Sequence, residues 1–284
     1  MQNKTILITG ATSGIGKVTA TELAKTGAHI LLLARNKEKA LRTKEEIITE
    51  TKNENIDIFI ADLSSLQKVK NVAAEIKSKY ERIDVLINNA GLMLTSKRQE
   101  SVDGNELTLA TNHLGSFLLT ALLFDLVKKS EHGRIINVSS EAYKMGKADF
   151  GNIQLKADYS AMWAYANSKL DNLLFTKELD RRIKKQGLNI SVNALHPGVV
   201  ATGFGQKSDG IAGFIFKAFR LFFTSPEKGA ATSIFLATAA EGGQVSGEYF
   251  KNKKITKTDD KLVNEANEKK LWEVSESLTG VKFL

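Results

Sequence analysis

Two kinds of segment alternate along the chain from its first residues. Short runs rich in β-branched and apolar residues, without apolar–polar alternation, are separated by longer stretches with apolar residues at helical spacing. Strands that are apolar on both faces indicate a parallel sheet covered by helices on both sides, and right-handed crossovers then give a doubly wound α/β architecture. The expected strands are 5–9, 29–33, 57–60, 85–87, 134–138 and 190–194, and the expected helices include 16–25, 37–51, 66–79, 102–129 and 165–185.

The rest of the chain continues this pattern without a domain boundary. No Pro- or Gly-rich linker divides it, and its only prolines are Pro197 and Pro226. Ser225 followed by Pro226 is typical of a helix start, with serine as the N-cap and proline at the first helical position. We therefore expect residues 1–284 to form one domain that ends in a charged helix near 259–277.

Composition narrows the chemistry that this chain can perform. There is no cysteine, which excludes disulfides, thiolate metal sites, iron–sulfur clusters and cysteine nucleophiles. The four histidines lack paired ligand spacing, so we expect no metal site. Forty Lys and Arg against thirty-two Asp and Glu give a net charge of +8. Because the lysines lie beside glutamates, solvated helix faces explain most of them; we expect no nucleic-acid partner, with a polyanion as the minor alternative.

No segment predicts export or a membrane span. The N-terminal residues lead into a short apolar run, without the longer apolar core and cleavage site of a signal peptide. The longest apolar stretch, 211–223, is interrupted by Lys217 and Arg220 and is shorter than the about 20 residues that a transmembrane helix needs. We expect a cytoplasmic protein.

A glycine-rich turn follows the first expected strand and opens the first helix. Glycines at such a turn let the backbone approach a pyrophosphate, which then lies over the amides and the positive end of the helix. The spacing Gly-x-x-x-Gly-x-Gly differs from the common dinucleotide fingerprint, but its place in the first βαβ unit indicates a dinucleotide site rather than a purely structural turn. The residues expected to bind the cofactor here are Gly10, Thr12, Ser13, Gly14, Ile15 and Gly16.

The end of the second strand indicates which dinucleotide binds. An NAD site usually places a carboxylate about 20 residues beyond the glycines to hold the ribose 2′-hydroxyl, whereas arginine suits a 2′-phosphate. This strand ends in Ala34, Arg35 and Asn36 without a carboxylate, and the guanidinium of Arg35 can stack on adenine and pair with phosphate. We predict that the Arg35–Asn36 end of the strand binds NADP(H) in preference to NAD(H). A plain surface arginine is the alternative.

Tyr165 and Lys169 lie four residues apart at the start of a strongly helical stretch. Residues at this spacing share one helix face, so the phenol and the ammonium project together. A nearby cation lowers the pKa of a tyrosine from about 10, and a tyrosine tuned in this way can exchange a proton with an alkoxide or an alcohol. The same lysine can hydrogen-bond a nicotinamide ribose. The pair alone is a weak signal, and the glycine turn makes it specific.

Together these motifs resemble the short-chain dehydrogenase/reductase superfamily over nearly the whole chain, and within it the retinol dehydrogenase group. The resemblance implies a single-domain Rossmann fold with a doubly wound parallel sheet of seven strands in the order 3-2-1-4-5-6-7, and a catalytic Asn–Ser–Tyr–Lys tetrad. The segments that carry it are 9–16, 62–63, 88–91, 112–115, 137–140, 165–169, 196–200 with Thr202, and 271–275.

The resemblance also implies roles for individual residues. Tyr165 is expected to be the general acid/base, Lys169 to lower its pKa and hold the ribose, and Asn112 to complete a water-linked proton relay through Lys169. Of two adjacent serines, Ser140 is expected to polarise the substrate carbonyl and Ser139 to be structural. The other implied cofactor contacts are Asp62 and Leu63 at the adenine, Asn89, Ala90 and Gly91 at the adenosine ribose, and Pro197, Gly198, Val200 and Thr202 towards the carboxamide or phosphate end.

One feature of the related proteins is missing from this sequence. Animal retinol dehydrogenases carry an apolar N-terminal membrane anchor that the present sequence does not show, which leaves membrane residence and retinoid specificity open. A weaker resemblance to light-dependent protochlorophyllide reductase is opposed by the absence of cysteine.

The family places its substrate lid after the Pro197-Gly198 loop, so we expect a lid at about 203–224. Five phenylalanines in 211–223 favour an apolar cover that excludes water. Two interpretations stay open beside it: a basic amphipathic helix in weak contact with a membrane surface, and a subunit contact or core helix. The residues outside the tetrad that attract notice are His113 and His196, expected to be structural, and Tyr159 and Trp163, expected either to touch substrate or to pack in the core.

The sequence thus predicts an NADP(H)-dependent oxidoreductase. It would transfer hydride between nicotinamide and a small apolar aldehyde or ketone, or the matching alcohol, without a metal. The family often forms dimers and tetramers, so a homodimer or homotetramer is compatible with the resemblance. A non-catalytic, nucleotide-sensing Rossmann scaffold that binds a protein partner is the alternative, although all four tetrad positions are occupied.

Overall fold

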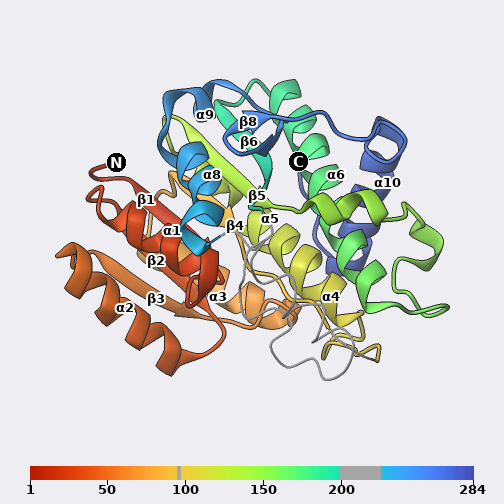
Figure 1. Cartoon of the computed structure of the whole chain (residues 1–284), viewed down its shortest axis with the longest axis horizontal. Helices are drawn as coiled ribbons and strands as arrows, with labels where there is room; N and C mark the ends of the chain where they lie inside the picture. The colour runs from red at the N-terminus through yellow and green to blue at the C-terminus, as the bar shows by residue number, and fades with distance from the viewer. Residues whose placement is uncertain (95–96, 199–224) are drawn as a thin grey trace.

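The computed structural model describes residues 1–94, 97–198 and 225–284. Its strands form one sheet in the order β3-β2-β1-β4-β5-β6-β7-β8 (Figure 1). Neighbours from β3 to β7 pair in parallel, whereas β8 runs antiparallel to β7. The strands are β1 (Thr5–Thr9), β2 (His29–Ala34), β3 (Ile56–Ile60), β4 (Val85–Asn88), β5 (Gly133–Val138), β6 (Ile190–His196), β7 (Tyr249–Lys251) and β8 (Lys254–Ile255).

The order of the first seven strands is as expected, but the expected number of strands is wrong. The chain turns back after β7 through Asn252 and Lys253, whose φ angles are 51° and 62°. Two consecutive residues with positive φ make the tight hairpin turn that matches the twist of the strands. This turn adds the two-residue β8 at the sheet edge, and its sequence lacks the glycine that usually signals such a turn.

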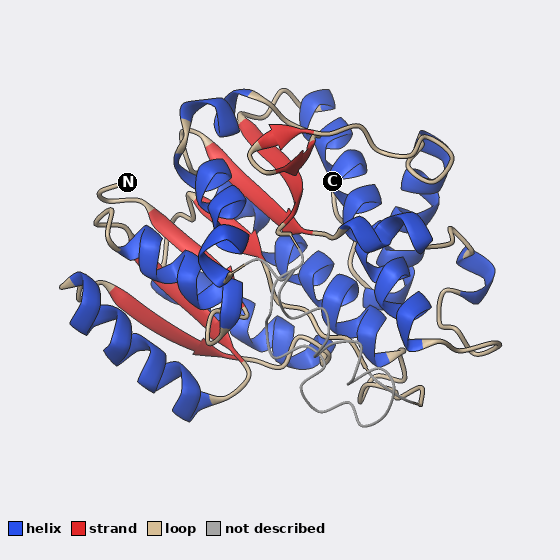
Figure 2. Cartoon of the chain, viewed as in Figure 1, coloured by secondary structure: helices blue, strands red, loops and turns tan. Residues whose placement is uncertain are grey.

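Helices cover both faces of the sheet (Figure 2). One layer contains α1, α2 and α8, and the other contains α3, α5, α6 and α10. The helices are α1 (Gly14–Ala24), α2 (Lys37–Thr51), α3 (Leu66–Lys79), α4 (Leu107–Leu109), α5 (Gly115–Lys128), α6 (Ala161–Lys185), α8 (Pro226–Thr238), α9 (Ala240–Gln244) and α10 (Glu265–Thr279), with a π-helical turn η1 (Ala110–Leu114) and 3-10 turns η2 (Glu141–Met145) and η3 (Phe150–Asn152).

The strands lack apolar–polar alternation because each face of the sheet has its own core. Ile6 and Ile8 point to the core shared with α1 and α8, whereas Leu7 between them points to the core under α5 and α6. All three side chains are fully buried. Successive side chains of a strand point to opposite faces, so a strand covered on both sides is apolar throughout.

The long helix expected at 102–129 is the main difference in helical structure. The regular helix begins only at Leu107, and it passes through the π-helical turn η1 before α5. By length and composition, the segment Leu107–Lys128 could cross a membrane. However, 78% of the apolar 18-residue stretch within it is buried inside the protein. The apolar character of this segment is therefore explained by core packing.

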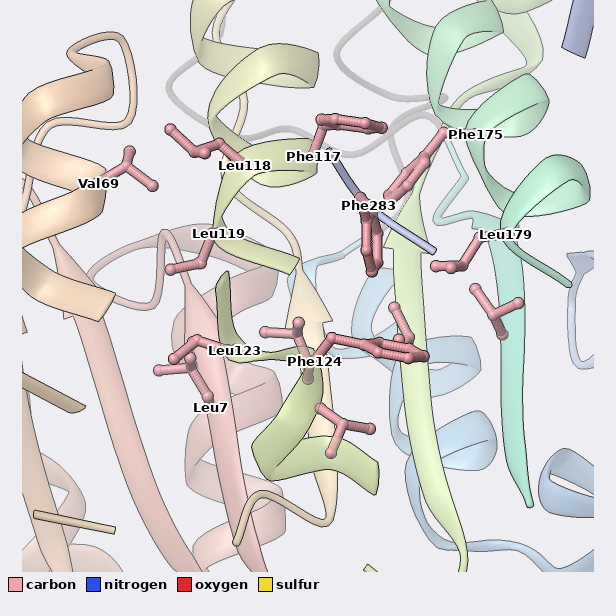
Figure 3. Close-up of a cluster of buried hydrophobic side chains, with 14 of the residues drawn as sticks. Leu7, Val69, Phe117, Leu118, Leu119, Leu123, Phe124, Phe175, Leu179 and Phe283 are labelled. Carbon is pink, nitrogen blue, oxygen red and sulfur yellow. The ribbon is translucent and has the colours of Figure 1, made fainter. Parts of the chain in front are cut away.

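The C-terminal part of the chain closes over α5 and α6. Phe117 and Phe124 of α5, Phe175 of α6 and Phe283 near the C-terminus meet in one cluster (Figure 3). The C-terminal helix α10 runs over 265–279 rather than 259–277, because Asn264 caps its first turn. The expected helix start at Ser225 and Pro226 is confirmed, with the Ser225 side chain accepting from the amide of Lys228.

Candidate active site

The glycine turn after β1 is fastened to the segment that follows β4. The Thr9 hydroxyl accepts hydrogen bonds from the amides of Asn89 (3.0 Å) and Ala90 (2.9 Å). In return, the Asn89 side-chain amide donates to the carbonyls of Thr9 (2.8 Å) and Gly10 (3.3 Å). The residues expected at the pyrophosphate and at the adenosine ribose therefore form one rigid unit where β1 and β4 end.

Two of the glycines are required by close packing within this unit. A side chain at Gly10 would place its Cβ 2.8 Å from Cα of Ala90, and one at Gly16 would place it 2.4 Å from the Asn89 side chain. Gly10 also has φ +67°, in the left-handed region where glycine is favoured. Any larger residue at these two positions would move the turn.

The start of α1 fits a bound anion. Ser13 takes the N-cap position, yet within the described residues its side chain caps no amide. The first turn, Gly14-Ile15-Gly16, contains no carboxylate. Free amides and the positive end of the helix are the groups that bind phosphate at such turns. The donor set therefore fits the pyrophosphate of a dinucleotide over residues 10–16, including Thr12.

Arg35 lies at the exposed end of β2, in the wall of a pocket of about 320 Å³. Asp62, just after β3, is held in this wall because its carboxylate accepts from the amide (3.0 Å) and hydroxyl (2.8 Å) of Ser64. Lys68 adds a second cation to the pocket. Asn36 does not line the pocket in the described structure; its side chain caps α2 by accepting from the amide of Lys39 at 2.8 Å.

The tetrad residues come from three elements that meet beside Gly91. Tyr165 and Lys169 lie on α6, Ser140 follows β5, and Asn112 lies in the π-helical turn. The Tyr165 hydroxyl is hydrogen-bonded to the Ser140 side chain. The Lys169 Nζ atom lies 5.5 Å from the centre of the Tyr165 ring and donates to the carbonyl of Val138 at 3.0 Å.

Asn112 and Lys169 converge on the backbone of Gly91. A Cβ atom on Gly91 would lie 3.3 Å from Lys169 Nζ and 3.5 Å from Asn112 Oδ1. The Asn112 side chain is fully buried. Its oxygen accepts from the amide of Leu92 (2.7 Å), and its nitrogen donates to the carbonyl of Leu92 (2.9 Å) and to Ser168 Oγ (2.9 Å). The Asn112 side chain is therefore held in one orientation by contacts with the loop after β4 and with α6.

Burial controls the ionisation of the tetrad. It raises the pKa of Tyr165, and the hydrogen bond from Ser140 opposes this only in part. It lowers the pKa of Lys169 to about 8, since the ammonium is fully buried. The direction for Tyr165 is opposite to the lowering expected from a neighbouring cation, because loss of water around the phenolate outweighs the other influences.

The remaining predicted residues lie in several separate parts of the chain. Ser139 is buried and donates to the backbone carbonyl of Lys169 at 2.6 Å, which joins β5 to α6 and agrees with a structural role. His196 ends β6 and accepts from the amide of Glu141 at 3.3 Å. Leu63 is buried against α5, and Pro197 and Gly198 follow β6. Val200, Thr202, the expected lid at 203–224 and the segment 211–223 lie outside the described residues.

The two aromatic residues before the tetrad helix point to different environments. Trp163 is 37% exposed, and the Lys147 Nζ atom lies 4.0 Å above its ring. The Tyr159 hydroxyl is buried, with its pKa raised mainly by burial. Over residues 1–94, 97–198 and 225–284, no group of three or more His, Asp or Glu side chains is arranged to hold a metal ion.

Several supporting residues had no role assigned to them from the sequence. Thr9 and Ser168 lie within the motif segments 9–16 and 165–169, and Asn172 lies just beyond the second of these. Their long-range hydrogen-bond partners are 34 to 81 residues away along the chain. Only the short spacing between Tyr165 and Ser168, on the same helix face, gave a signal that could have been used.

A doubly wound parallel sheet with a glycine turn between its first strand and first helix is typical of Rossmann-type dinucleotide-binding proteins. Residues 4–210 match the short chain dehydrogenase family, and the chain belongs to that family. It is an oxidoreductase similar to retinol dehydrogenases.

Related proteins match almost the whole chain. Human retinol dehydrogenase 13 is 42% identical over 98% of this chain and 85% of its own length. Human retinol dehydrogenase 14 is 39% identical over 99% of this chain and 88% of its own length. The expected resemblance is therefore confirmed at the level of the family.

Solved structures match the fold as well. A protein of Mycobacterium paratuberculosis, 29% identical, has a TM-score of 0.80 and covers 100% of this chain and 96% of its own. A short chain dehydrogenase of Escherichia coli complexed with NADPH, 24% identical, has a TM-score of 0.70 and covers 89% of this chain and 98% of its own. At that identity the second comparison supports the fold alone.

Proposed function

We propose that this protein is an NADP(H)-dependent oxidoreductase that interconverts apolar aldehydes or ketones and the matching alcohols, with Tyr165 as the general acid/base. The observation that carries the proposal is the buried phenol of Tyr165, hydrogen-bonded to Ser140 and one helical turn from Lys169. The names of the retinol dehydrogenase relatives support an alcohol or aldehyde group as the reacting centre.

Each residue of the tetrad has its own role in the proposed reaction. The bound nicotinamide cofactor supplies or accepts the hydride. In the direction of reduction, the Tyr165 hydroxyl gives its proton to the oxygen of the substrate, and the Ser140 hydroxyl holds that oxygen by a hydrogen bond. Lys169 and Asn112, which share the surface of Gly91, hold the ribose side of the site and the proton path behind the tyrosine.

The ionisation of Tyr165 favours a proton donor in the free enzyme. Because burial raises its pKa, the phenol carries its proton at neutral pH. A buried lysine with a pKa of about 8 can still be charged at neutral pH, and this charge stabilises the phenolate that remains after proton transfer. The site is therefore suited to carbonyl reduction at neutral pH and to alcohol oxidation at higher pH.

The preference for NADP(H) is proposed from the pocket at the ends of β2 and β3. Arg35 and Lys68 contribute positive charges to its wall, and Asp62 and Glu75 contribute carboxylates. A planar guanidinium binds phosphate through two parallel hydrogen bonds, which suits a 2′-phosphate. Asp62 in the same wall can accept from the adenine amino group.

We propose one domain over 1–284, a cytoplasmic location, an apolar lid at about 203–224 and no nucleic-acid partner. A homodimer or homotetramer is compatible with the family, and weak membrane contact through 211–223 is the alternative role for the lid segment.

The first experiment tests Tyr165. Turnover of a panel of aldehydes, ketones and retinoids with NADPH or NADH is followed at the nicotinamide absorbance band. Tyr165→Phe should reduce kcat by roughly a hundredfold or more while leaving the dissociation constant of the cofactor within about twofold, because general acid catalysis contributes at this scale. Tyr80→Phe, at the opposite end of the sheet, is the matched control. Unchanged turnover in Tyr165→Phe would exclude the proposed mechanism and favour the nucleotide-sensing scaffold.

The second experiment tests Arg35. Arg35→Ala should weaken NADP⁺ binding about tenfold or more, as expected for loss of a charge-assisted phosphate contact, and should leave NAD⁺ binding unchanged. Arg42→Ala removes the same charge from the exposed surface of α2 and serves as the control. Equal effects of the two variants, or an unchanged preference in Arg35→Ala, would contradict the assignment of NADP(H).

A further inference from the structure

The C-terminal helix reaches the residue next to Asn112. His113 follows Asn112 in the π-helical turn and is fully buried. Its Nε2 atom lies 2.7 Å from the hydroxyl of Ser275 on α10. Phe117 and Phe175 flank the ring, each with its centroid 6.0 Å away. Two segments that stood out in the sequence, 112–115 and 271–275, are therefore in direct contact.

The hydrogen bonds of Ser275 determine the state of the imidazole. The Ser275 hydroxyl donates its single proton to the carbonyl of Leu271 at 2.8 Å, so it can only accept from His113. The Nε2 atom therefore carries a proton, and Nδ1 is the unprotonated nitrogen of a neutral ring. Burial lowers the pKa of His113 to about 4, which agrees with a neutral ring at physiological pH.

The π-helical turn is held from two opposite sides. Asn112 is fixed to the loop after β4 through both backbone groups of Leu92, and His113 is fixed to α10 through Ser275. A π-helical turn has a wider hydrogen-bonding repeat than an α-helix and is frequently found at functional sites. Since adjacent residues share this one turn, movement of His113 changes the direction in which the Asn112 side chain projects.

Within the described residues, the Nδ1 atom of His113 is buried without a hydrogen-bond partner. The hydrogen bond between Nε2 and Ser275 is therefore the polar contact that holds the ring, and Phe117 and Phe175 pack beside it.

We propose that His113, through its hydrogen bond to Ser275 of the C-terminal helix, is a positioning residue that sets where Asn112 stands relative to Lys169. The inference rests on the proposed function, because it concerns the support of the same tetrad. His113 is fully buried and acts through its neighbour Asn112. The C-terminal helix is accordingly part of the catalytic apparatus rather than only a cover for α5 and α6.

The test compares two disrupting variants with a conservative variant and a matched control. His113→Phe keeps an aromatic ring and removes the polar atoms, and Ser275→Ala removes only the hydroxyl. His113→Gln retains an amide donor that can reach Ser275. Thr279→Val removes another buried hydroxyl of α10, one turn further on, which donates to the backbone carbonyl of Ser275 at 2.7 Å.

The direct readout is hydrogen exchange of the Leu92 amide, because this amide donates to Asn112 Oδ1. We expect exchange at Leu92 to be about tenfold faster or more in His113→Phe and Ser275→Ala, and nearly unchanged in His113→Gln and Thr279→Val. In the same disrupting variants kcat should fall about fivefold or more with KM values within about twofold, and His113→Gln should restore most of kcat.

The outcomes separate this inference from the proposed function. If Ser275→Ala and Thr279→Val lower the melting temperature equally and neither changes exchange at Leu92 or kcat, His113 is structural and the inference is wrong. If the unmodified chain turns over no carbonyl or alcohol substrate, the proposed function fails, and the catalytic part of the inference fails with it. An active enzyme whose Leu92 exchange is insensitive to His113→Phe overturns the inference and leaves the proposed function intact.

Discussion

Burial, more than charge pairing, determines the pKa values of the titratable residues of the site. Tyr165, Lys169 and His113 all have pKa values moved by loss of water around the charged form. For the lysine and the histidine this lowers the pKa, and for the tyrosine it raises it. From the sequence, Tyr165 and Lys169 could be placed on one helix face, but the extent of their burial depends on β5, η2 and the loop after β4.

The first residue-scale prediction concerns the pH dependence of turnover. Since the pKa of Lys169 is about 8, its charge is lost above that pH in the free enzyme. In the direction of carbonyl reduction, we expect kcat/KM for NADPH to decrease as the pH rises, with an apparent pKa near 8, because kcat/KM reports the ionisable groups of the free enzyme. In Lys169→Arg this decrease should occur at higher pH, because a guanidinium stays protonated. A decrease at the same pH in the variant would show that another group is responsible.

The second residue-scale prediction concerns stability in acid. His113 has a folded-state pKa of about 4, below its ordinary value of 6.5. Between these values the unfolded chain binds a proton that the folded chain does not, so stability falls as the pH decreases from 6.5 to about 4. The loss from this residue is at most about 3 kcal/mol. Urea unfolding at pH 7 and pH 4.5 measures it, and His113→Gln should reduce the pH dependence; an equal pH dependence in the variant would contradict the assignment.

At the scale of elements, the regular helices and strands were predictable and the irregular turns were not. The expected strand 5–9 and the helices 37–51 and 66–79 coincide with β1, α2 and α3. These elements carry a strong local pattern and, in α2 and α3, an Asn or Ser N-cap. The π-helical turn has no local signature, because it is stabilised by partners at Leu92, Ser168 and Ser275.

The element-scale prediction tests the unit formed by the glycine turn and the segment after β4. Thr9→Val keeps the size of the side chain and leaves the Ala90 amide without its acceptor, whereas the Asn89 amide keeps the carbonyl of Ile87 at 3.1 Å. We expect a loss of about 1–3 kcal/mol in the free energy of unfolding and weaker cofactor binding, because a part-buried amide that loses its acceptor is costly. Thr9→Ser, which keeps the hydroxyl, should retain most of both quantities. Equal losses in the two variants would mean that packing of the methyl group, and not the hydroxyl, is what matters.

In the whole molecule, the site is assembled from segments that are far apart in the sequence. The sheet brings the ends of β1 and β4 together, and α10 packs against α6 and the π-helical turn. Arg182 of α6 adds to this closure by donating to the carbonyl of Leu284 (2.7 Å) and lying 4.2 Å above the ring of Trp272. The C-terminal segment therefore stabilises the layer that contains the tetrad helix.

The whole-molecule prediction tests this closure. Phe283 is 6% exposed, and its ring stacks on Trp272 with centroids 5.1 Å apart. Phe283→Ala should lower the free energy of unfolding by about 3–5 kcal/mol, as expected for loss of a buried aromatic ring. Val102→Ala, at a position that is 85% exposed, is the control and should change stability by less than about 0.5 kcal/mol. Denaturant unfolding checks both, and a small effect of Phe283→Ala would show that the C-terminal segment contributes little to the fold.

The sequence by itself determined the doubly wound architecture, most element positions, and the glycine turn and Tyr–Lys pair, because each depends on local spacing or on apolar patterning. Only the tertiary structure decided the antiparallel β8, the burial that sets the Tyr165 and Lys169 pKa values, and the link from Ser275 through His113 to Asn112. These features depend on contacts between residues far apart in the chain, and the local sequence around each residue does not indicate which partner it contacts.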